Sequence, residues 1–176
     1  SGGVLVLSKA SGVTAVPGDL AISNGAKVLF SASGVNEQIA NGAAVTMSGA
    51  NSGFNCTGFN SNFRDITETI GSLDVSGGVF HTGTAPWTVT GSVHFAGEGN
   101  TIFLGNSGST SHFGSLSLTG MNAASSGNVP NSFNIYGNAS PQSSVFVGSG
   151  GLTLDGSVIY LRNGSLTGAK GSRLVL

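Results

Sequence analysis

Three histidines, His81, His94 and His112, are the side chains of this sequence best suited to acid–base or metal chemistry. A nucleophilic triad needs a histidine beside a serine, with an acid that orients the ring. The chain has no G-x-S-x-G turn and no acid at a recognisable spacing from a histidine. His94 lies between Val93 and Phe95, so in a strand it points away from the apolar face. We expect all three histidines to be polar residues that face solvent.

Paired carboxylates are the second group that could do chemistry, because retaining glycosidases use two carboxylates about 5–5.5 Å apart. Asp74 and Asp155 lie several repeats apart in the sequence, and Asp155-Gly156 is typical of a turn. The single cysteine, Cys56, allows neither an intramolecular disulfide nor a cysteine-based zinc site. We therefore predict no enzymatic activity, no cofactor and no metal.

The composition argues against two kinds of partner. The 176 residues carry six basic and seven acidic side chains, and charged residues make up only 7% of the chain. Ordinary soluble domains have roughly 25% charged residues. A protein without a basic surface is not expected to bind nucleic acid. The longest apolar runs are far shorter than the roughly 20 residues of a membrane helix, so we expect no membrane span.

The elements that must position these residues are short strands. Apolar and polar residues alternate in brief runs bounded by Gly or Asn, and no window has the periodicity of a helix. In the run GSLDVSG, Leu73 and Val75 share one face while Asp74 takes the other. Ser, Thr and Asn dominate the polar residues, and they suit strands and turns better than helix interiors. The chain is therefore predicted to be all-β.

These runs recur with a loose period. A similar phrase with alternating apolar residues begins at Gly71, Gly91, Gly114, Gly150 and Gly171, with spacings of 20, 23, 36 and 21 residues. A period of about 20 residues built from several short strands predicts a parallel β-helix, or β-solenoid, in which coils stack on one another. The 36-residue interval is expected to contain one extra turn, carried by a strand at 131–137. The glycines are expected to turn corners that need a positive φ.

Three stretches interrupt this pattern and are predicted to be loops that leave the rod, at residues 32–41, 50–66 and 121–143. The second of them contains Phe54, Phe59 and Phe63, enough apolar area to fold back on a face or to contact a partner.

An antiparallel β-sandwich remains an alternative fold, because short strands suit it equally well. Its strands would be joined by tight hairpins, and Asn-Gly is a hairpin dipeptide. Such dipeptides occur at Asn24-Gly25, Asn41-Gly42 and Asn163-Gly164.

Segments 68–83, 111–120 and 150–176 resemble the autotransporter-associated β-strand repeat of long bacterial surface and secreted proteins. The resemblance is carried by ETIGSLDVSGGVFHTG, SHFGSLSLTG and GGLTLDGSVIYLRNGSLTGAKGSRLVL. It implies a right-handed parallel β-helix that is secreted or held at the bacterial cell surface. Segments of this family commonly serve as stalks, adhesins or aggregation factors.

The two ends of the chain are similar strand-like sequences without protective charges or prolines. Read from Leu176 onward into Ser1, the sequence GSRLVLSGGVLVLS keeps a continuous strand rhythm. We therefore expect residues 1–176 to be one solenoid segment of a longer protein or fibre, with other copies or repeats of itself as partners. The residues of this end-to-end interface would be Val4, Leu5, Val6, Leu7, Leu174, Val175 and Leu176.

The sequence thus predicts a non-enzymatic structural rod of an extracellular or cell-surface fibre, stalk or matrix, able to assemble head to tail. The alternative is an adhesin-type module that recognises glycan or a host surface through the Phe/Asn-rich loops 50–66 and 121–143. Both predictions place the protein outside the cell or on the bacterial surface.

Overall fold

A computed structural model describes most of the first two thirds of the chain and several strands beyond it. The described residues are 2–56, 63–83, 85–96, 101–104, 110–120, 132–135, 144–155 and 174–175. They form strands joined by turns and contain no helix.

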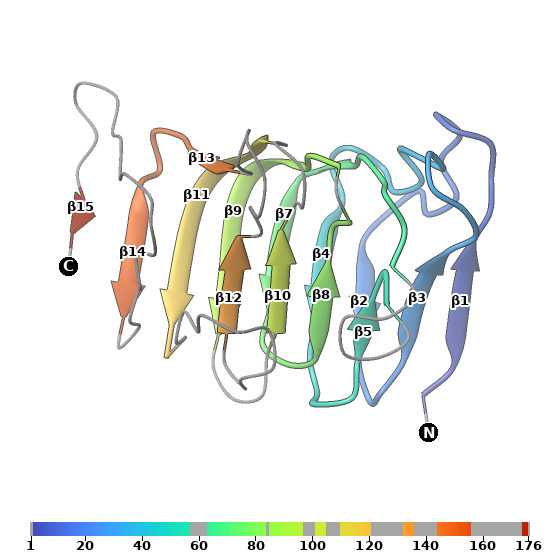
Figure 1. Cartoon of the computed structure of the whole chain (residues 1–176), viewed down its shortest axis with the longest axis horizontal. Helices are drawn as coiled ribbons and strands as arrows, with labels where there is room; N and C mark the ends of the chain where they lie inside the picture. Colours follow the sequence, from blue (N-terminus) through green and yellow to red (C-terminus); the bar gives the residue numbers. More distant parts are fainter. Residues whose placement is uncertain are drawn as a thin grey trace.

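The strands form two parallel sheets that face each other (Figure 1). The six-stranded sheet has the order β1 (Val4–Leu7), β3 (Lys27–Phe30), β5 (Gly53–Phe54), β8 (Val79–His81), β10 (Thr101–Leu104), β12 (Ser132–Ile135). The nine-stranded sheet has the main order β2 (Leu20–Ile22), β4 (Ala44–Met47), β7 (Ser72–Val75), β9 (Thr88–Ala96), β11 (Thr110–Thr119), β14 (Leu152–Asp155), β15 (Leu174–Val175). Two further strands lie beside this path, β6 (Thr69–Ile70) on β9 and β13 (Ser144–Val147) on β11.

The chain alternates between the two sheets, and each described pair of neighbouring strands is parallel. It therefore winds as a β-solenoid, which confirms the predicted fold and excludes the sandwich. The hairpin dipeptide Asn24-Gly25 forms a corner between β2 and β3 instead, with φ values of 54° and 75°. Asn41-Gly42 likewise precedes β4 at a corner, and Asn163-Gly164 lies outside the described residues.

One column of apolar residues shows how the coils are registered. Leu73 pairs with Val93, Val93 with Leu116, Leu116 with Leu152, and Leu152 with Leu174. These residues follow the glycines of the repeated phrase, so the phrase does mark successive coils. The extra turn expected in the 36-residue interval is absent, because β11 pairs directly with β14. The strand expected at 131–137 is β12, which lies on β10 in the other sheet. The interval is thus one coil with an insertion.

Two of the predicted loops are partly built into the coils. Residues 50–66 include β5 and the buried side chains of Phe54 and Ile66. Residues 32–41 include Ile39, which is buried and forms a parallel bridge with Val16. The expectation that these stretches leave the rod is therefore wrong for Ile39, Phe54 and Ile66, because their side chains complete the core. In 121–143 only β12 is described.

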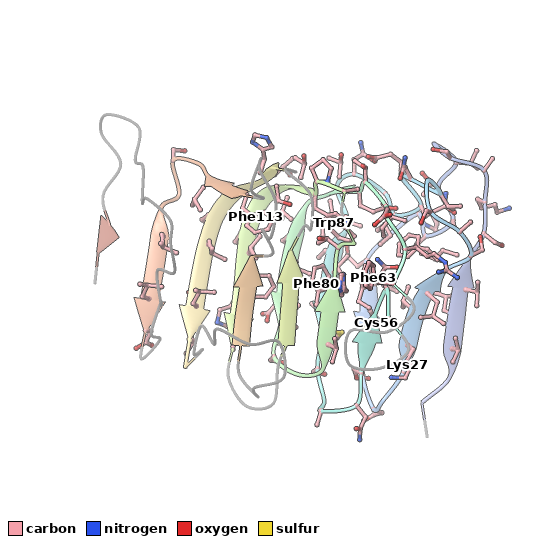
Figure 2. All side chains as sticks on the ribbon, viewed as in Figure 1. Lys27, Cys56, Phe63, Phe80, Trp87 and Phe113 are labelled. Carbon is pink, nitrogen blue, oxygen red and sulfur yellow. The ribbon has the colours of Figure 1, made fainter. Side chains whose placement is uncertain are left out.

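The core fills the space between the sheets. In β7, Leu73 and Val75 are buried and Asp74 is exposed, as the alternation predicts. Aromatic rings occupy the middle of the stack: Phe54 and Phe80 stack with centroids 5.0 Å apart, and Trp87 meets both rings edge-on at 5.3 Å (Figure 2). Side chains one coil apart therefore pack directly on each other.

The glycines that begin the repeated phrase are required for a different reason from the one expected. A Cβ on Gly71 would lie 2.5 Å from the carbonyl oxygen of Gly42, and one on Gly91 would lie 2.7 Å from that of Gly71. On Gly114 it would lie 2.6 Å from the carbonyl oxygen of Gly91. None of these three has a positive φ, so the corner explanation is wrong for them, although it holds for Gly25. They form a glycine spine in which consecutive coils approach backbone to backbone.

Replacing a spine glycine should therefore destabilise the stack. For Gly71→Ala the new methyl group meets backbone rather than a flexible side chain, so we expect the free energy of unfolding to fall by about 1–3 kcal/mol. Chemical denaturation followed by circular dichroism measures this change. Gly18→Ala is the matched control, because its Cβ would meet nothing within 4 Å. Equal stabilities of the two variants would contradict the spine.

Candidate functional site

A buried carboxylate joins neighbouring coils at the corner between the sheets. Glu68 is buried, and its Oε1 and Oε2 accept the N–H groups of Gln38 and Ile39 at 2.8 and 3.1 Å. Gln38 is also buried and continues the chain of contacts into the coil before it. Its Oε1 accepts the N–H of Lys9 at 2.9 Å, and its Nε2 donates to the carbonyl of Ala10 at 3.1 Å. Two side chains thus hold three successive coils together.

The period of two in the sequence already contains a signal for this site, although sequence reasoning missed it. Ile66, Glu68 and Ile70 alternate with two threonines, so the period places Glu68 on the inward face with the isoleucines. All three of these side chains are buried in the structure. A carboxylate on the inward face of a strand needs buried hydrogen-bond donors, and the backbone N–H groups of the neighbouring coil provide them.

A second carboxylate lies beside Glu68. Glu37, on the neighbouring coil, accepts a hydrogen bond from Thr69 Oγ1 through its Oε1 at 3.1 Å, and its Oε2 is buried with no hydrogen-bond partner. Burial raises the pKa of Glu68 from 4.5 to about 7; the two N–H donors oppose this rise and the charge of Glu37 adds to it. Glu68 is buried with both oxygens bonded to backbone, so its carboxylate joins two neighbouring coils.

His81 is also buried, so the expectation that it faces solvent is wrong. It ends β8, where the chain turns the corner, and the ring of Phe63 covers it with centroids 4.0 Å apart and nearly parallel planes. Its Nδ1 accepts the N–H of Gly83 at 2.8 Å. Burial lowers the pKa of His81 from 6.5 to about 4, against an opposing effect of Asp65.

Asn55 clamps the covering segment onto this corner. It adopts a positive φ of 56°, and its Nδ2 donates to the carbonyls of Arg64 and His81 at 2.7 and 3.1 Å. Its Oδ1 accepts the N–H of Arg64 at 3.0 Å. One buried amide therefore replaces the sheet hydrogen bonds that the backbone loses where the chain turns.

The predicted contact residues Phe54, Phe59 and Phe63 do not form one exposed group. Phe54 belongs to β5 and is buried in the core, so its assignment to an exposed loop is wrong. Phe63 is half-buried against His81 (Figure 2), and Phe59 lies outside the described residues.

The outer face of the nine-stranded sheet brings together an acid, a histidine and a hydroxyl. His94 Nδ1 lies 3.4 Å from Asp74 Oδ1, and His94 Nε2 lies 3.2 Å from Thr119 Oγ1. The three side chains come from β7, β9 and β11, so stacking aligns residues that are 20 and 25 positions apart. Sequence reasoning found no acid near a histidine because it did not compare equivalent positions of successive coils.

This arrangement has the order of groups found in a nucleophilic triad, but it lies on an open sheet face, where Asp74 is exposed and His94 is half-buried. The outward placement predicted for His94 and His112 is confirmed, since His112 is exposed as well. Asp155 belongs to β14, with β9 and β11 between it and Asp74, so these two carboxylates do not form a pair.

Two observations on the described residues concern metal ligands and the single thiol. Its residues contain no group of three or more His, Cys, Asp or Glu side chains able to hold a metal ion. Cys56 is buried, and its Sγ lies 3.4 Å from the carbonyl oxygen of Val79. Burial raises the pKa of this thiol to about 11.

The predicted interface residues lie at the two ends of the stack. Val4, Leu5 and Val6 are 59%, 44% and 52% exposed on β1, the outermost strand of its sheet, whereas Leu7 is buried. Leu174 and Val175 form β15, at the opposite end and in the other sheet (Figure 1), and Leu176 lies outside the described residues.

An apolar groove opens at the β1 end, between the two sheets. It has a volume of about 290 Å³ and is lined by Gly3, Val4, Leu5, Leu20, Ala21, Ile22, Ala26, Lys27 and Val28. Leu5 pairs with Val28, which points into the core, so the groove is the open end of the core itself.

No known protein family, curated protein or solved structure matches the chain. Among the described residues, no helix is long and apolar enough to cross a membrane. Function must therefore be inferred from the solenoid and from the groups that it brings together.

Glu68 should make stability depend on pH. Its pKa is higher in the folded chain, about 7 against 4.5, so its contribution is fully present below pH 4.5 and is lost as the pH rises through 7. The loss amounts to about 3 kcal/mol. His81 acts in the opposite sense: its folded pKa of about 4 against 6.5 removes stability as the pH falls from 6.5 to 4.

Because the two groups oppose each other, we expect the unfolding free energy of the wild type to vary little between pH 4.5 and 6.5. The difference between Glu68→Gln and wild type isolates the carboxylate. Denaturant titrations should show the variant gaining about 3 kcal/mol on the wild type from pH 4.5 to above 7. A difference that stays constant with pH would refute the assignment.

Cys56 should be inert in the folded chain. With a pKa of about 11 and a buried Sγ, it forms almost no thiolate at pH 8. We expect Ellman's reagent to label it at least about 100-fold more slowly in the native protein than in guanidinium chloride. Comparable rates in the two conditions would show that the corner around Cys56 opens readily.

Proposed function

We propose that this chain is a structural rod, a non-enzymatic building element of an extracellular or cell-surface fibre, stalk or matrix. The observation that carries the proposal is the parallel stack of the described strands, whose interior is filled by buried apolar side chains from Leu7 to Leu118. Each coil adds about 4.8 Å of length, so the rod becomes longer in proportion to the number of coils in the sequence.

The contacts between coils suit a structural element. Besides the sheet hydrogen bonds, Glu68 and Gln38 tie three coils together through buried bonds to backbone groups. Such buried bonds are lost only when coils separate, which makes the stack resist peeling from its corners.

A location outside the cell or on the bacterial surface is part of this proposal. The resemblance to autotransporter-associated repeats favours it. The single thiol, buried and with a raised pKa, would also stay unpaired in an oxidising environment. On the nine-stranded sheet most outward side chains of the described strands are Ser or Thr, among them Thr46, Thr90 and Ser92, which hydrate well and carry no charge.

The alternative is an adhesin that recognises glycan or a host surface through residues 50–66 and 121–143. Within 50–66, Phe54 is part of the core, and one ring face of Phe63 is covered by His81. Deleting all of 50–66 would therefore remove core residues, and residues 57–62 are the segment whose replacement leaves the described contacts in place.

Two measurements test the proposal together. Small-angle scattering should show an elongated particle with a single cross-section, in the wild type and in a variant whose residues 57–62 are replaced by Gly and Ser. Neither protein should bind a panel of immobilised glycans or degrade soluble polysaccharides. Glycan binding by the wild type that the variant loses would support the adhesin, and polysaccharide cleavage would overturn the non-enzymatic proposal.

A further inference from the structure

The outer face of the nine-stranded sheet places a carboxylate beside an imidazole on neighbouring coils. Asp74 on β7 and His94 on β9 are paired in register, and the two strands lie side by side (Figure 1). Asp74 Oδ1 lies 3.4 Å from His94 Nδ1, and the two side chains are 56% and 37% exposed. Because both strands lie inside the sheet, backbone hydrogen bonds fix their spacing, and an ion can reach the pair from solvent.

The distance between these two atoms equals the distance between two ligands of a tetrahedral zinc ion. Zinc binds imidazole nitrogen at about 2.0–2.1 Å and carboxylate oxygen at about 2.0–2.2 Å. At the tetrahedral angle, two such bonds place the ligand atoms about 3.4 Å apart. Square-planar coordination, which suits Cu²⁺, would require about 2.9 Å at similar bond lengths. The spacing of the pair therefore fits a tetrahedral ion.

The third group of this line, Thr119 on β11, is placed to orient the ring. His94 Nε2 lies 3.2 Å from Thr119 Oγ1. When Nε2 donates its proton to this hydroxyl, Nδ1 carries a lone pair beside the carboxylate of Asp74. Metal-binding histidines almost always donate their other ring N–H to an oxygen in this way, which fixes the tautomer and the ring orientation. Thr119 is thus a positioning residue that makes Nδ1 the ligand atom.

The charge of the surrounding face favours a cation. The strands of the nine-stranded sheet contain no lysine and no arginine. The residues that flank the pair in register are Thr46 beside Asp74 and Ser117 beside His94, and both are uncharged. No basic side chain of these strands therefore competes with an ion for the carboxylate.

We propose that Asp74 and His94 form a zinc-binding site, with Oδ1 and Nδ1 as the two protein ligands. The other two positions of a tetrahedral ion are open to water or to a ligand from outside the chain. Because the ligands come from β7 and β9, a bound ion links two neighbouring coils and stabilises the folded chain by mass action. The proposal departs from the sequence-based expectation of no metal, because residues 20 positions apart become neighbours only when the coils stack.

Isothermal titration calorimetry with zinc chloride and protein without a histidine tag tests the site. Asp74→Asn and His94→Ala should each weaken zinc binding at least about 10-fold, the loss expected even for an orienting partner. His112→Ala is the matched control and should bind zinc like the wild type. His112 is also exposed on the outer face, but its register neighbours are Thr88 and Phe146 rather than an acid. A wild type that does not bind zinc, or an Asp74→Asn variant of unchanged affinity, would overturn the proposal.

Nitrogen NMR of the imidazole rings identifies the ligand atom. Zinc should shift the Nδ1 resonance of His94 and leave Nε2 protonated. Thr119→Val should weaken zinc binding about 10-fold and let the Nε2 proton redistribute to Nδ1 in the metal-free protein. Ser117→Ala, which changes the register neighbour of His94 on the same strand, should alter neither property. A ring that stays protonated on both nitrogens when zinc is added would show a simple ion pair with Asp74 and reject the site.

Discussion

The spacing of about 4.8 Å between hydrogen-bonded strands is the constraint on which the rest of this structure depends. Every residue of one coil must fit against its counterpart one coil away at that distance. At the glycine spine the backbones come so close that a Cβ on Gly71 would lie 2.5 Å from a carbonyl oxygen. In the core the same spacing stacks Phe54 on Phe80. The glycines of the repeated phrase are thus present because this packing distance leaves no room for a side chain.

The corners are where this constraint is hardest to meet, because backbone groups there leave the regular ladders. Buried side chains replace the missing partners: Glu68 and Gln38 at one corner, Asn55 at another. Burying a carboxylate and an imidazole to do this shifts their pKa values in opposite directions. The cost of burying Glu68 grows as the pH rises and the cost of burying His81 grows as the pH falls, so between pH 4.5 and 6.5 the two costs change in opposite directions.

Stacking also aligns side chains on the outside, and this is how Asp74, His94 and Thr119 come to form a line. A catalytic triad needs more than this order, since a substrate must be held and its developing charge stabilised. On a flat sheet face the line instead links three neighbouring coils. The same logic supports the proposed rod, because the architecture repeats its contacts along an axis.

The alternation and glycine spacing were sufficient to predict the parallel coils, the inward positions of Leu73, Val93 and Leu116, and the outward position of Asp74. These properties are local, because a period of two and a recurring phrase can be recognised without knowing any partner. The burial of His81 and Phe54, and the single coil within the 36-residue interval, were not predicted correctly. Each of them depends on which residue of a neighbouring coil covers a position, and only the three-dimensional stack decides that.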